Sequence, residues 1–374
     1  MSLIGTFVEC ERAQGCWSAS AGRPGVARGQ RRTQFSSEVD TQQAWASRAD
    51  AGAVVYCYSD RHQNARWRDV KMSTSIARIG ILSPVTEAGM RDWWQKLKEG
   101  LEELGYVEGR NIEFVRRFGD GKFDRLPALA AELAALGVDV IMPATPPAIY
   151  AAKSASSSIP IVFPLGSDPV ETGLVSNLER PGGNVTGMAT MSRLQSQPRL
   201  ALVRECIPSA KRVALIRHSA NPALNLQVEA SNTAASGLAL EVVVLDFAVA
   251  EEIEKAFETA AEQKVDAILP LSDPMALGNA ERIGTLSLRY KIPLVSPFRE
   301  ITDAGGVLSY GPDLSMLFRR SASLVDQILK GAKPGDLPIG KPSDFELGAN
   351  PQAAKALNVT IPASILSRAT YVCR

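Results

Sequence analysis

The chain contains the stretch Val138-Asp139-Val140-Ile141-Met142-Pro143-Ala144-Thr145-Pro146, and a later stretch repeats it as Val265-Asp266-Ala267-Ile268-Leu269-Pro270-Leu271-Ser272-Asp273-Pro274. Each is a short apolar run that ends in a proline-bearing loop, and each follows an Ala- and Glu-rich helical segment. A short apolar run of this kind is typical of a strand buried inside a parallel sheet. The repetition therefore predicts the same kind of buried strand in both halves of the chain.

Two more pairs of segments extend the repeat in the same order and at similar spacing. Residues 78–82 (Arg-Ile-Gly-Ile-Leu) resemble residues 212–216 (Arg-Val-Ala-Leu-Ile). Residues 159–162 (Ile-Pro-Ile-Val) resemble residues 292–295 (Ile-Pro-Leu-Val). One α/β unit used twice explains all three pairs and predicts two similar lobes. Small molecules bind preferentially in clefts between such units.

From residue 76 onward, strand and helix patterns alternate, which predicts an α/β fold with parallel sheets covered on both faces. In the first lobe we expect strands at 76–82, 112–116, 138–142 and 159–163, and helices at 88–104, 123–136 and 147–156. In the second lobe we expect strands at 213–216, 267–269 and 294–296, and helices at 224–236, 250–263 and 276–290. Ligands of such sheets bind beyond the carboxyl ends of the strands.

Composition narrows the class of protein. The 374 residues are 45% hydrophobic and 22% charged, as in ordinary globular proteins. A formal net charge of +1 gives no overall attraction to nucleic acid, so we expect no nucleic-acid partner. The sequence contains no apolar run of about 18 residues that would span a bilayer.

Residues 1–72 differ from the rest, because they are rich in Gly, Ser, Gln and Arg and show no sustained helical or strand period. We expect this segment to be a disordered extension or a spurious one, with Met72 or a nearby residue as the true start. The pair Arg31-Arg32 is not followed closely by an apolar segment, and no signal-peptide pattern is visible.

Catalytic signatures are missing from the sequence. No Gly-x-Gly-x-x-Gly follows the first predicted strand, and no phosphate-binding loop of the Gly-Lys-Ser/Thr type occurs. The two histidines are His62 and His218, and the five cysteines lack metal-binding spacing. We therefore expect a protein that is not an enzyme, with no cofactor and no metal site.

Several ordered motifs resemble one known family. They are Gly105-Tyr106-Val107-Glu108-Gly109-Arg110-Asn111-Ile112, Ser167-Asp168-Pro169-Val170, Arg180-Pro181-Gly182-Gly183-Asn184-Val185-Thr186-Gly187, Gly305-Gly306-Val307-Leu308-Ser309-Tyr310-Gly311-Pro312-Asp313 and Ile328-Leu329-Lys330-Gly331-Ala332-Lys333-Pro334. Together they resemble the ABC-transporter substrate-binding family whose better-known members take up tryptophan, tyrosine or phenylalanine. The resemblance covers about residues 76–374.

The resemblance implies a type I periplasmic-binding-protein fold, with two Rossmann-like lobes and parallel sheets joined by a three-strand hinge. Lobe 1 would comprise residues 76–188 and 308–338, and lobe 2 residues 189–307 and 339–374. The helix at 314–330 would pack on the first lobe, and residues 345–347 would lie in an edge strand of the second.

In function, the resemblance implies a solute receptor of an ABC importer. It would capture a small carboxylate-bearing ligand, such as an aromatic or branched amino acid, by hinge closure, and would deliver it to a membrane permease. The protein would be periplasmic or otherwise extracytoplasmic and monomeric, with a dimer as the alternative. A cytosolic ligand-sensing or effector domain of the same fold is the competing interpretation.

In the first lobe, the candidate ligand-binding residues follow predicted strands or belong to the family motifs. Ser83 and Pro84 close the first strand, where Ser83 could donate to a ligand carboxylate or cap the next turn. Thr145 and Pro146 precede a helix, whose N-terminus favours an anion, although plain capping is the alternative. Ser167 and Asp168 lie in the family motif, and Asp168 could pair with an α-amino group or open a turn before proline.

In the second lobe, the candidates also follow predicted strands: His218, Asn221, Ser272, Asp273, Phe298, Arg299 and Tyr310. Phe298 could cover an apolar ligand or fill the lobe interior. Arg299 could clamp a carboxylate or form an exposed interlobe salt bridge. Tyr310 lies in a crossover, where it could line the cleft or brace the hinge. Trp93 and Trp94 are expected near the cleft rim, with core packing as the alternative.

Overall fold

The computed structural model describes residues 76–343 and 345–373. The predicted extension at 1–72 lies outside the described residues.

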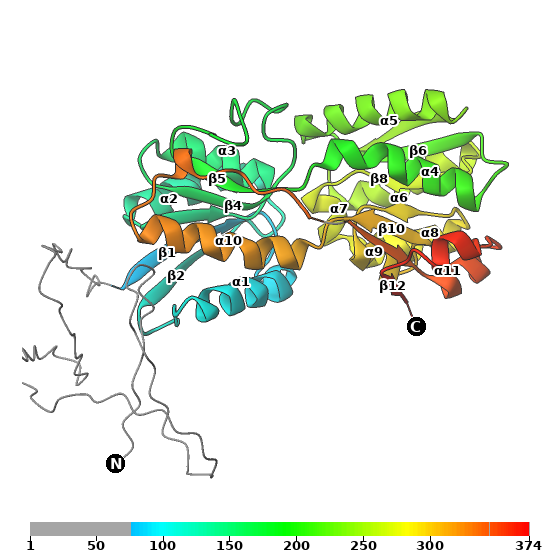
Figure 1. The fold of residues 1–374 in the computed structure, drawn as a ribbon. Helices are drawn as coiled ribbons and strands as arrows, with labels where there is room; N and C mark the ends of the chain where they lie inside the picture. Colours follow the sequence, from blue (N-terminus) through cyan, green and yellow to red (C-terminus); the bar gives the residue numbers. More distant parts are fainter. Residues whose placement is uncertain (1–75, 344, 374) are drawn as a thin grey trace, which may run out of the picture. The chain divides into compact units, whose positions relative to one another are not determined.

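The first lobe is built on a five-stranded parallel sheet of order β2-β1-β3-β4-β5 (Figure 1). Its strands are β1 (Ala77–Ser83), β2 (Ile112–Phe118), β3 (Val140–Pro143), β4 (Ile161–Gly166) and β5 (Val185–Ala189). The inner strands are almost wholly buried and apolar, as expected for a sheet covered on both faces. The strand β5 was not expected, because its residues follow the turn at Pro181-Gly182-Gly183 without a long apolar run.

The second lobe carries a three-stranded sheet, β7-β6-β8, and a four-stranded sheet, β12-β11-β10-β9. The strands are β6 (Arg212–His218), β7 (Glu241–Phe247), β8 (Ala267–Pro270), β9 (Val295–Ser296), β10 (Leu308–Gly311), β11 (Glu346–Ala349) and β12 (Tyr371–Val372). A parallel bridge between Ile268 and Leu294 connects the two sheets. The pairing of β10 with β11 is antiparallel, and β12 pairs beyond β11. The predicted edge strand at 345–347 is therefore covered by β12.

The two lobes repeat one another in pairing register, which confirms the duplication predicted from sequence. Arg78 pairs with Glu113 across β1 and β2, and Arg212 pairs with Glu241 across β6 and β7. Both arginines form ion pairs with these glutamates, at 3.3 Å and 2.9 Å. In both lobes the Nη1 group of the arginine also donates to the backbone carbonyl just after a helix end. The same sequence unit thus folds twice with the same local contacts.

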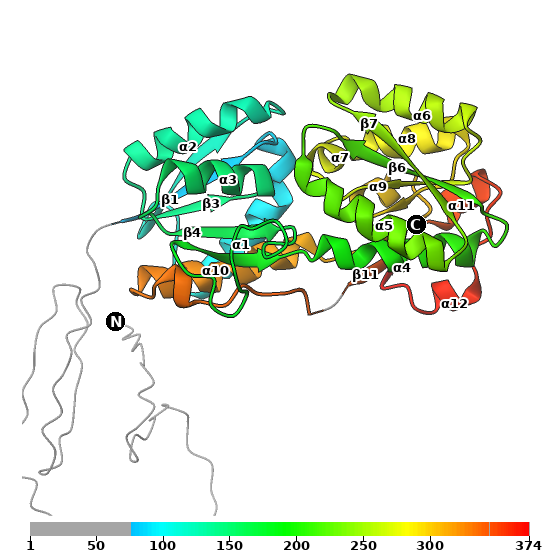
Figure 2. The same cartoon turned by 90° about the horizontal axis from the view of Figure 1, so that it is seen from above.

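In each lobe, helices lie on both faces of the sheets (Figures 1 and 2). In the first lobe, α1 (Arg91–Glu103) and α10 (Leu314–Leu329) pack together, as do α2 (Leu126–Ala135) and α3 (Pro146–Ala155). In the second lobe, α4 (Ser196–Cys206) packs with α5 (Asn225–Gly237), and α6 (Ile253–Glu262) packs with α8 (Ala280–Tyr290). The shorter helices are α7 (Pro274–Gly278), α9 (Arg299–Asp303), α11 (Pro351–Ala356) and α12 (Ala363–Leu366).

Helix boundaries differ from the predicted ones at a few points. Short 3-10 helices precede five of the long helices: η1 (Ala88–Met90), η2 (Phe123–Arg125), η3 (Ser192–Gln195), η4 (Pro222–Leu224) and η5 (Ala250–Glu252). A sixth, η6 (Pro334–Asp336), follows α10. The helix predicted at 276–290 is two helices, because the chain leaves helical geometry at Asn279. No helix in the described part of the chain combines the length and apolarity needed to cross a membrane.

Three segments connect the lobes. The first follows β5, the second joins β10 to α10, and the third leads from residue 340 to β11. The backbone N–H of Gly340 donates to the carbonyl of Gly187 at 2.9 Å, so residues 339–340 run along β5. The strand β10 pairs with β9 and β11, so residues 308–311 belong to the four-stranded sheet of the second lobe. The predicted boundary, with residue 308 onward in the first lobe, is therefore wrong for these residues. The chain enters the first lobe only at α10 (Figure 1).

Candidate functional site

A cavity lies between the lobes, at the carboxyl ends of their strands. Its lining comes from the first lobe, the second lobe and two of the connecting segments: Val85, Trp93, Thr145, Pro146, Leu165, Ser167, Thr190, Ser192, Gln195, Ser272, Asp273, Pro274, Leu277, Pro297, Phe298, Pro312 and Leu314. The cavity is narrow, with a volume of about 50 Å³. Six of the candidate ligand-binding residues line it, namely Thr145, Pro146, Ser167, Ser272, Asp273 and Phe298, and so does Trp93, which the sequence places near the cleft rim.

Thr145 brings an unused hydroxyl to the cavity. It is the residue before α3, yet its side chain does not cap the helix. The side chain is 3% exposed, and its Oγ1 forms no hydrogen bond with any described residue. A buried polar atom without a partner is costly, and such atoms mark places where a ligand can supply the missing contact. Pro146 and Pro147 carry no backbone N–H, so the first two residues of α3 offer no main-chain donor, whereas the Thr145 hydroxyl can donate at this end of the helix.

Ser167 and Asp168 follow β4, but only Ser167 lines the cavity. Asp168 is buried behind it, where Oδ2 accepts hydrogen bonds from the Arg193 N–H at 3.1 Å and from the Ser167 hydroxyl at 3.3 Å. Its Oδ1 has no hydrogen-bond partner among the described residues. Burial raises the pKa of the Asp168 carboxyl, against the lowering effect of the Arg193 N–H. The Asp168 carboxylate thus binds the main chain at Arg193, and its hydrogen bond with Ser167 connects it to the cavity wall.

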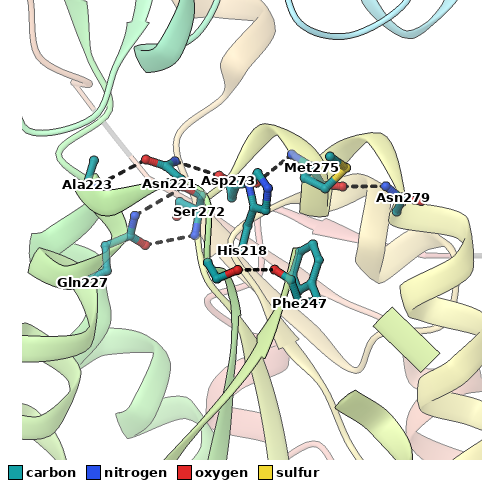
Figure 3. A network of polar contacts seen from close by, with 10 residues as sticks. His218, Asn221, Ala223, Gln227, Phe247, Ser272, Asp273, Met275 and Asn279 are labelled. Carbon is teal, nitrogen blue, oxygen red and sulfur yellow. Dashed lines mark hydrogen bonds and ion pairs between the residues drawn. The ribbon is translucent and has the colours of Figure 1, made fainter. Parts of the chain in front are cut away.

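Asp273 is the carboxylate on the cavity wall that the second lobe contributes, and it lies within a polar network (Figure 3). Its Oδ1 accepts the Met275 N–H at 2.7 Å, which caps α7, and its Oδ2 accepts the Asn221 amide at 2.7 Å. The Nδ1 atom of His218 lies 3.3 Å from Asp273 Oδ1 without hydrogen-bond geometry. The His218 ring also contacts the first lobe, with its centroid 5.3 Å from that of Phe123. Asn221 and His218 therefore contact Asp273 but do not line the cavity themselves.

Ser272 precedes Asp273 and makes three hydrogen bonds. Its N–H donates to Gln227 Oε1 at 2.9 Å, and its carbonyl accepts from Gln227 Nε2 at 3.3 Å (Figure 3). Its Oγ accepts a hydrogen bond from Nη1 of Arg199 at 3.2 Å. These contacts fix the position of the Ser272 hydroxyl in the cavity wall.

The rest of the cavity wall is mainly apolar. Trp93 on α1 stacks on Phe318 of α10, with ring centroids 5.6 Å apart, and also faces the cavity. Phe298 is 9% exposed; it packs in the core and also lines the cavity. An apolar wall with a few fixed polar groups is typical of small-molecule sites.

Four residues proposed from sequence lie away from this cavity. Ser83 Oγ accepts the Val85 N–H at 3.2 Å, which matches the turn-capping alternative, and the Pro84 carbonyl accepts the Gly121 N–H at 2.7 Å. Arg299 pairs with Asp303 at 3.4 Å within α9 and lies over the Tyr371 ring. The ring of Tyr310 stacks on Phe345, with centroids 5.5 Å apart, at the crossover between the lobes. Arg299 lines a neighbouring cavity.

The first connecting segment and α4 contribute further residues that were not predicted from the sequence. Thr190, Ser192 and Gln195 line the cavity, and Arg199 lies behind Gln195 and Ser272. These residues follow β5, a strand that the sequence pattern did not reveal, so their place at a strand end was not visible. In the described ranges, no three His, Cys, Asp or Glu side chains are grouped in a way that could hold a metal ion.

Comparison with known proteins places the chain in a family. The sequence model of the family described as "ABC transporter substrate binding protein" matches residues 78–373. A protein of Clostridioides difficile named tyrosine-binding protein is 27% identical over 281 residues, which cover 75% of this chain and 81% of the relative.

Solved structures agree in fold. A conserved domain protein from Vibrio cholerae is 28% identical, with a TM-score of 0.76 over 80% of this chain and 100% of that chain. An ABC domain from Streptococcus pneumoniae in complex with L-Trp is 26% identical, with a TM-score of 0.75 over 80% of this chain and 100% of that chain. The two-lobed α/β architecture is that of the type I periplasmic binding proteins. The chain belongs to the family of ABC transporter substrate-binding proteins.

Proposed function

We propose that this protein captures a small carboxylate-bearing ligand, an aromatic or branched amino acid, in the cavity between its lobes and delivers it to the membrane permease of an ABC importer. One observation carries the proposal: a single cavity takes polar groups from both lobes and encloses them in an apolar wall. A ligand that contacts both walls at once favours the state in which the walls are close together.

The polar groups of the cavity suit the ammonium and carboxylate groups of an amino acid. Asp273 supplies a carboxylate that can pair with an ammonium group, since a carboxylate accepts more hydrogen bonds than the two that Asp273 already receives. Thr145 supplies a free hydroxyl at the N-terminus of α3, where the helix dipole favours an anion. Trp93, Leu165 and Phe298 would surround an apolar side chain. The names of two relatives, which mention tyrosine and L-Trp, point to the same ligand class.

Ligand entry would require the lobes to move. A volume of about 50 Å³ is well below the roughly 300–1,000 Å³ of ordinary ligand sites. The three connecting segments are the natural places for a hinge, because a few residues at element ends can absorb the necessary backbone rotation. The closed, loaded form would be the one that the permease recognises.

The proposal includes no catalytic step. The cavity brings together hydroxyls, one amide and one carboxylate, and His218 lies behind Asp273 rather than beside a nucleophile. We propose an extracytoplasmic receptor, as the family resemblance implies, that acts as a monomer, with a dimer as the alternative.

A thermal-unfolding screen of the full chain tests the proposal. Tyrosine, tryptophan, phenylalanine, leucine, isoleucine and valine would be compared with sugars and nucleosides. A ligand present at 100 times its Kd stabilises the folded state by about 2.7 kcal/mol, which is a clear rise in Tm. We expect the rise with at least one aromatic or branched amino acid. A rise only with sugars or nucleosides would contradict the proposed ligand class.

Calorimetry would then test the site itself. Asp273→Asn keeps the size of the side chain and the acceptor for Met275 but removes the negative charge. We expect it to weaken amino-acid binding by about 10-fold or more, as for the loss of a hydrogen bond to a charged group. Asp266→Asn is the matched control. Asp266 precedes β8 and accepts the N–H groups of Lys211 and Arg212, at the end of this strand opposite to Asp273. An equal loss of affinity in both variants would argue against a direct role for Asp273.

A further inference from the structure

Arg199 is a buried cation directly behind the cavity wall. It lies on α4 and is 3% exposed. Its guanidinium makes three hydrogen bonds: Nε donates to the Tyr310 carbonyl at 2.8 Å, Nη1 donates to Ser272 Oγ at 3.2 Å, and Nη2 donates to Gln195 Oε1. Ser272 and Gln195 both line the cavity. The guanidinium is therefore separated from the cavity by one side chain.

All three acceptors of the guanidinium are uncharged. Within the described ranges, no carboxylate forms a hydrogen bond or an ion pair with Arg199. Burial lowers the pKa of Arg199 to about 9, so the group still carries its charge at neutral pH. A buried charge without a counterion is costly, and an anion placed nearby would recover part of that cost.

The hydrogen bonds around Ser272 determine what its hydroxyl can do. Arg199 has only donors, so Ser272 Oγ must be the acceptor of that bond. The backbone N–H and carbonyl of Ser272 are both occupied by Gln227. The hydroxyl proton of Ser272 thus remains free to donate, with a positive charge behind it. A hydroxyl polarised in this way favours an anionic acceptor.

We infer that Arg199 is a positioning residue that makes this cavity select ligands with a carboxylate group, acting through the hydroxyl of Ser272. The inference rests on the proposed function and adds to it a second hydroxyl for the carboxylate. Ser272 lines the cavity from the second lobe and Thr145 from the first, so each can donate to one oxygen of the carboxylate. The carboxylate would accept the Ser272 hydroxyl proton, and Arg199 would supply the counter-charge without direct contact. Because Arg199 also donates to the Tyr310 carbonyl, it connects this cavity wall to β10, from which the second connecting segment leads to α10.

The test compares ligands that differ only in the carboxylate. Calorimetry on the full chain would measure Kd for L-tyrosine and L-tyrosinamide, and for L-tryptophan, L-phenylalanine and L-leucine with their amides. The readout is the ratio of the amide Kd to the acid Kd. We expect Arg199→Met to lower this ratio by about 10- to 100-fold, the range for a hydrogen bond to a charged group. Arg199→Lys should retain part of the preference.

Arg204→Met is the matched control. Arg204 lies on the same helix and donates only to main-chain carbonyls, those of Pro208, Ala210, Leu238 and Ala239. Its loss should lower stability and leave the ratio unchanged. A purely structural role for Arg199 would affect acid and amide equally, and an unchanged ratio in Arg199→Met would overturn the inference.

A second variant keeps the test decisive if Arg199→Met does not fold. Ser272→Ala removes the hydroxyl but keeps the backbone contacts with Gln227, and we expect the same fall in the ratio. Binding of the acids with an unchanged ratio in Ser272→Ala would overturn the inference and leave the proposed function standing. Failure of the wild-type protein to bind any of the four acids would overturn the proposed ligand class and the inference together.

Discussion

Thr145 and Ser272 occupy equivalent positions in the internal duplication and line the same cavity from opposite lobes. Each lies two residues beyond a proline, Pro143 or Pro270, that ends the third strand of its lobe. The two prolines also hold the same register against the first strand of their lobe. The hydroxyls differ in one respect: Ser272 Oγ accepts from Arg199, whereas Thr145 Oγ1 has no partner among the described residues. Duplication thus supplies one hydroxyl to each wall.

We predict that Thr145→Val weakens binding of a carboxylate ligand by about 10-fold without lowering stability. The valine keeps the shape of the side chain and removes a buried hydroxyl that makes no hydrogen bond with any described residue. Its loss should therefore leave the free energy of unfolding unchanged or raise it by about 1 kcal/mol, while a bond to the ligand disappears. Calorimetry and urea unfolding would measure the two quantities.

Thr186→Val is the control for this substitution. Thr186 is also fully buried, but its Oγ1 donates to the Leu337 carbonyl at 2.9 Å. We expect a loss of stability of about 1–3 kcal/mol, because the carbonyl is left without its donor, and no specific loss of affinity. If Thr145→Val destabilised the ligand-free protein as much as Thr186→Val, the hydroxyl of Thr145 would have a structural partner instead.

Asp168 should make stability depend on pH. Burial raises the pKa of its carboxyl, so the folded protein binds the proton more tightly than the unfolded chain does. Its stabilising contribution is therefore fully present below the unfolded pKa and is lost as pH rises through the folded pKa. We predict that the stability of Asp168→Asn relative to wild type increases as pH rises from about 3 to about 7. Urea unfolding at several pH values would show this, and a constant difference would contradict it.

Asp168 also remains a predicted partner of the ligand ammonium group, in addition to Asp273; it would act from the first lobe through the hydroxyl of Ser167. Its Oδ1 has no hydrogen-bond partner among the described residues, and Ser167 connects its Oδ2 to the cavity wall. Asp168→Ala should lose most of the affinity for an amine-bearing ligand. Calorimetry with an amino acid and with its deaminated acid would separate this effect from a general loss of binding. Unchanged affinity would remove Asp168 from the site.

The packing of α10 on the first lobe depends on Gly100. A Cβ atom at Gly100 would lie 2.7 Å from the Arg319 carbonyl oxygen and 3.0 Å from Ala322 Cβ. We predict that Gly100→Ala lowers the free energy of unfolding by about 1–3 kcal/mol, because the helices cannot approach as closely. Gly237→Ala, at the end of α5 with open space around it, should be neutral or stabilising. Similar destabilisation by both changes would contradict the packing argument.

Phe298 should control which side chains the cavity accepts. Its ring lines the cavity at the end of β9, beside Pro297 and Leu277. Phe298→Ala should weaken binding of an aromatic amino acid by about 10-fold, as for the loss of one aromatic contact with its buried area. A small ligand such as alanine should be affected much less. Calorimetry with tyrosine, leucine and alanine would test this, and an equal loss for all three would assign Phe298 to the core alone.

The sequence by itself determined the two-lobed α/β fold. The repeated segments contain the strands β1, β3 and β4 and their counterparts β6, β8 and β9, and the structure pairs them in matching order and register. Alternation of apolar runs and helical periods is local information, so it survives in a single sequence. The same logic identified Thr145, Ser272 and Asp273, because residues that follow parallel strands gather at one edge of a sheet.

Only the tertiary structure decided which of those residues share one cavity. Ser83 and Arg299 also follow strands, yet Ser83 caps its own turn and Arg299 pairs within α9. Arg199 follows no strand directly; it reaches the site because α4 packs beneath the loop at Ser272. Two of its three hydrogen-bond partners, Ser272 and Tyr310, lie more than seventy residues away in sequence. Strand ends are set by local pattern, whereas the partner of a buried charge depends on the packing of distant elements.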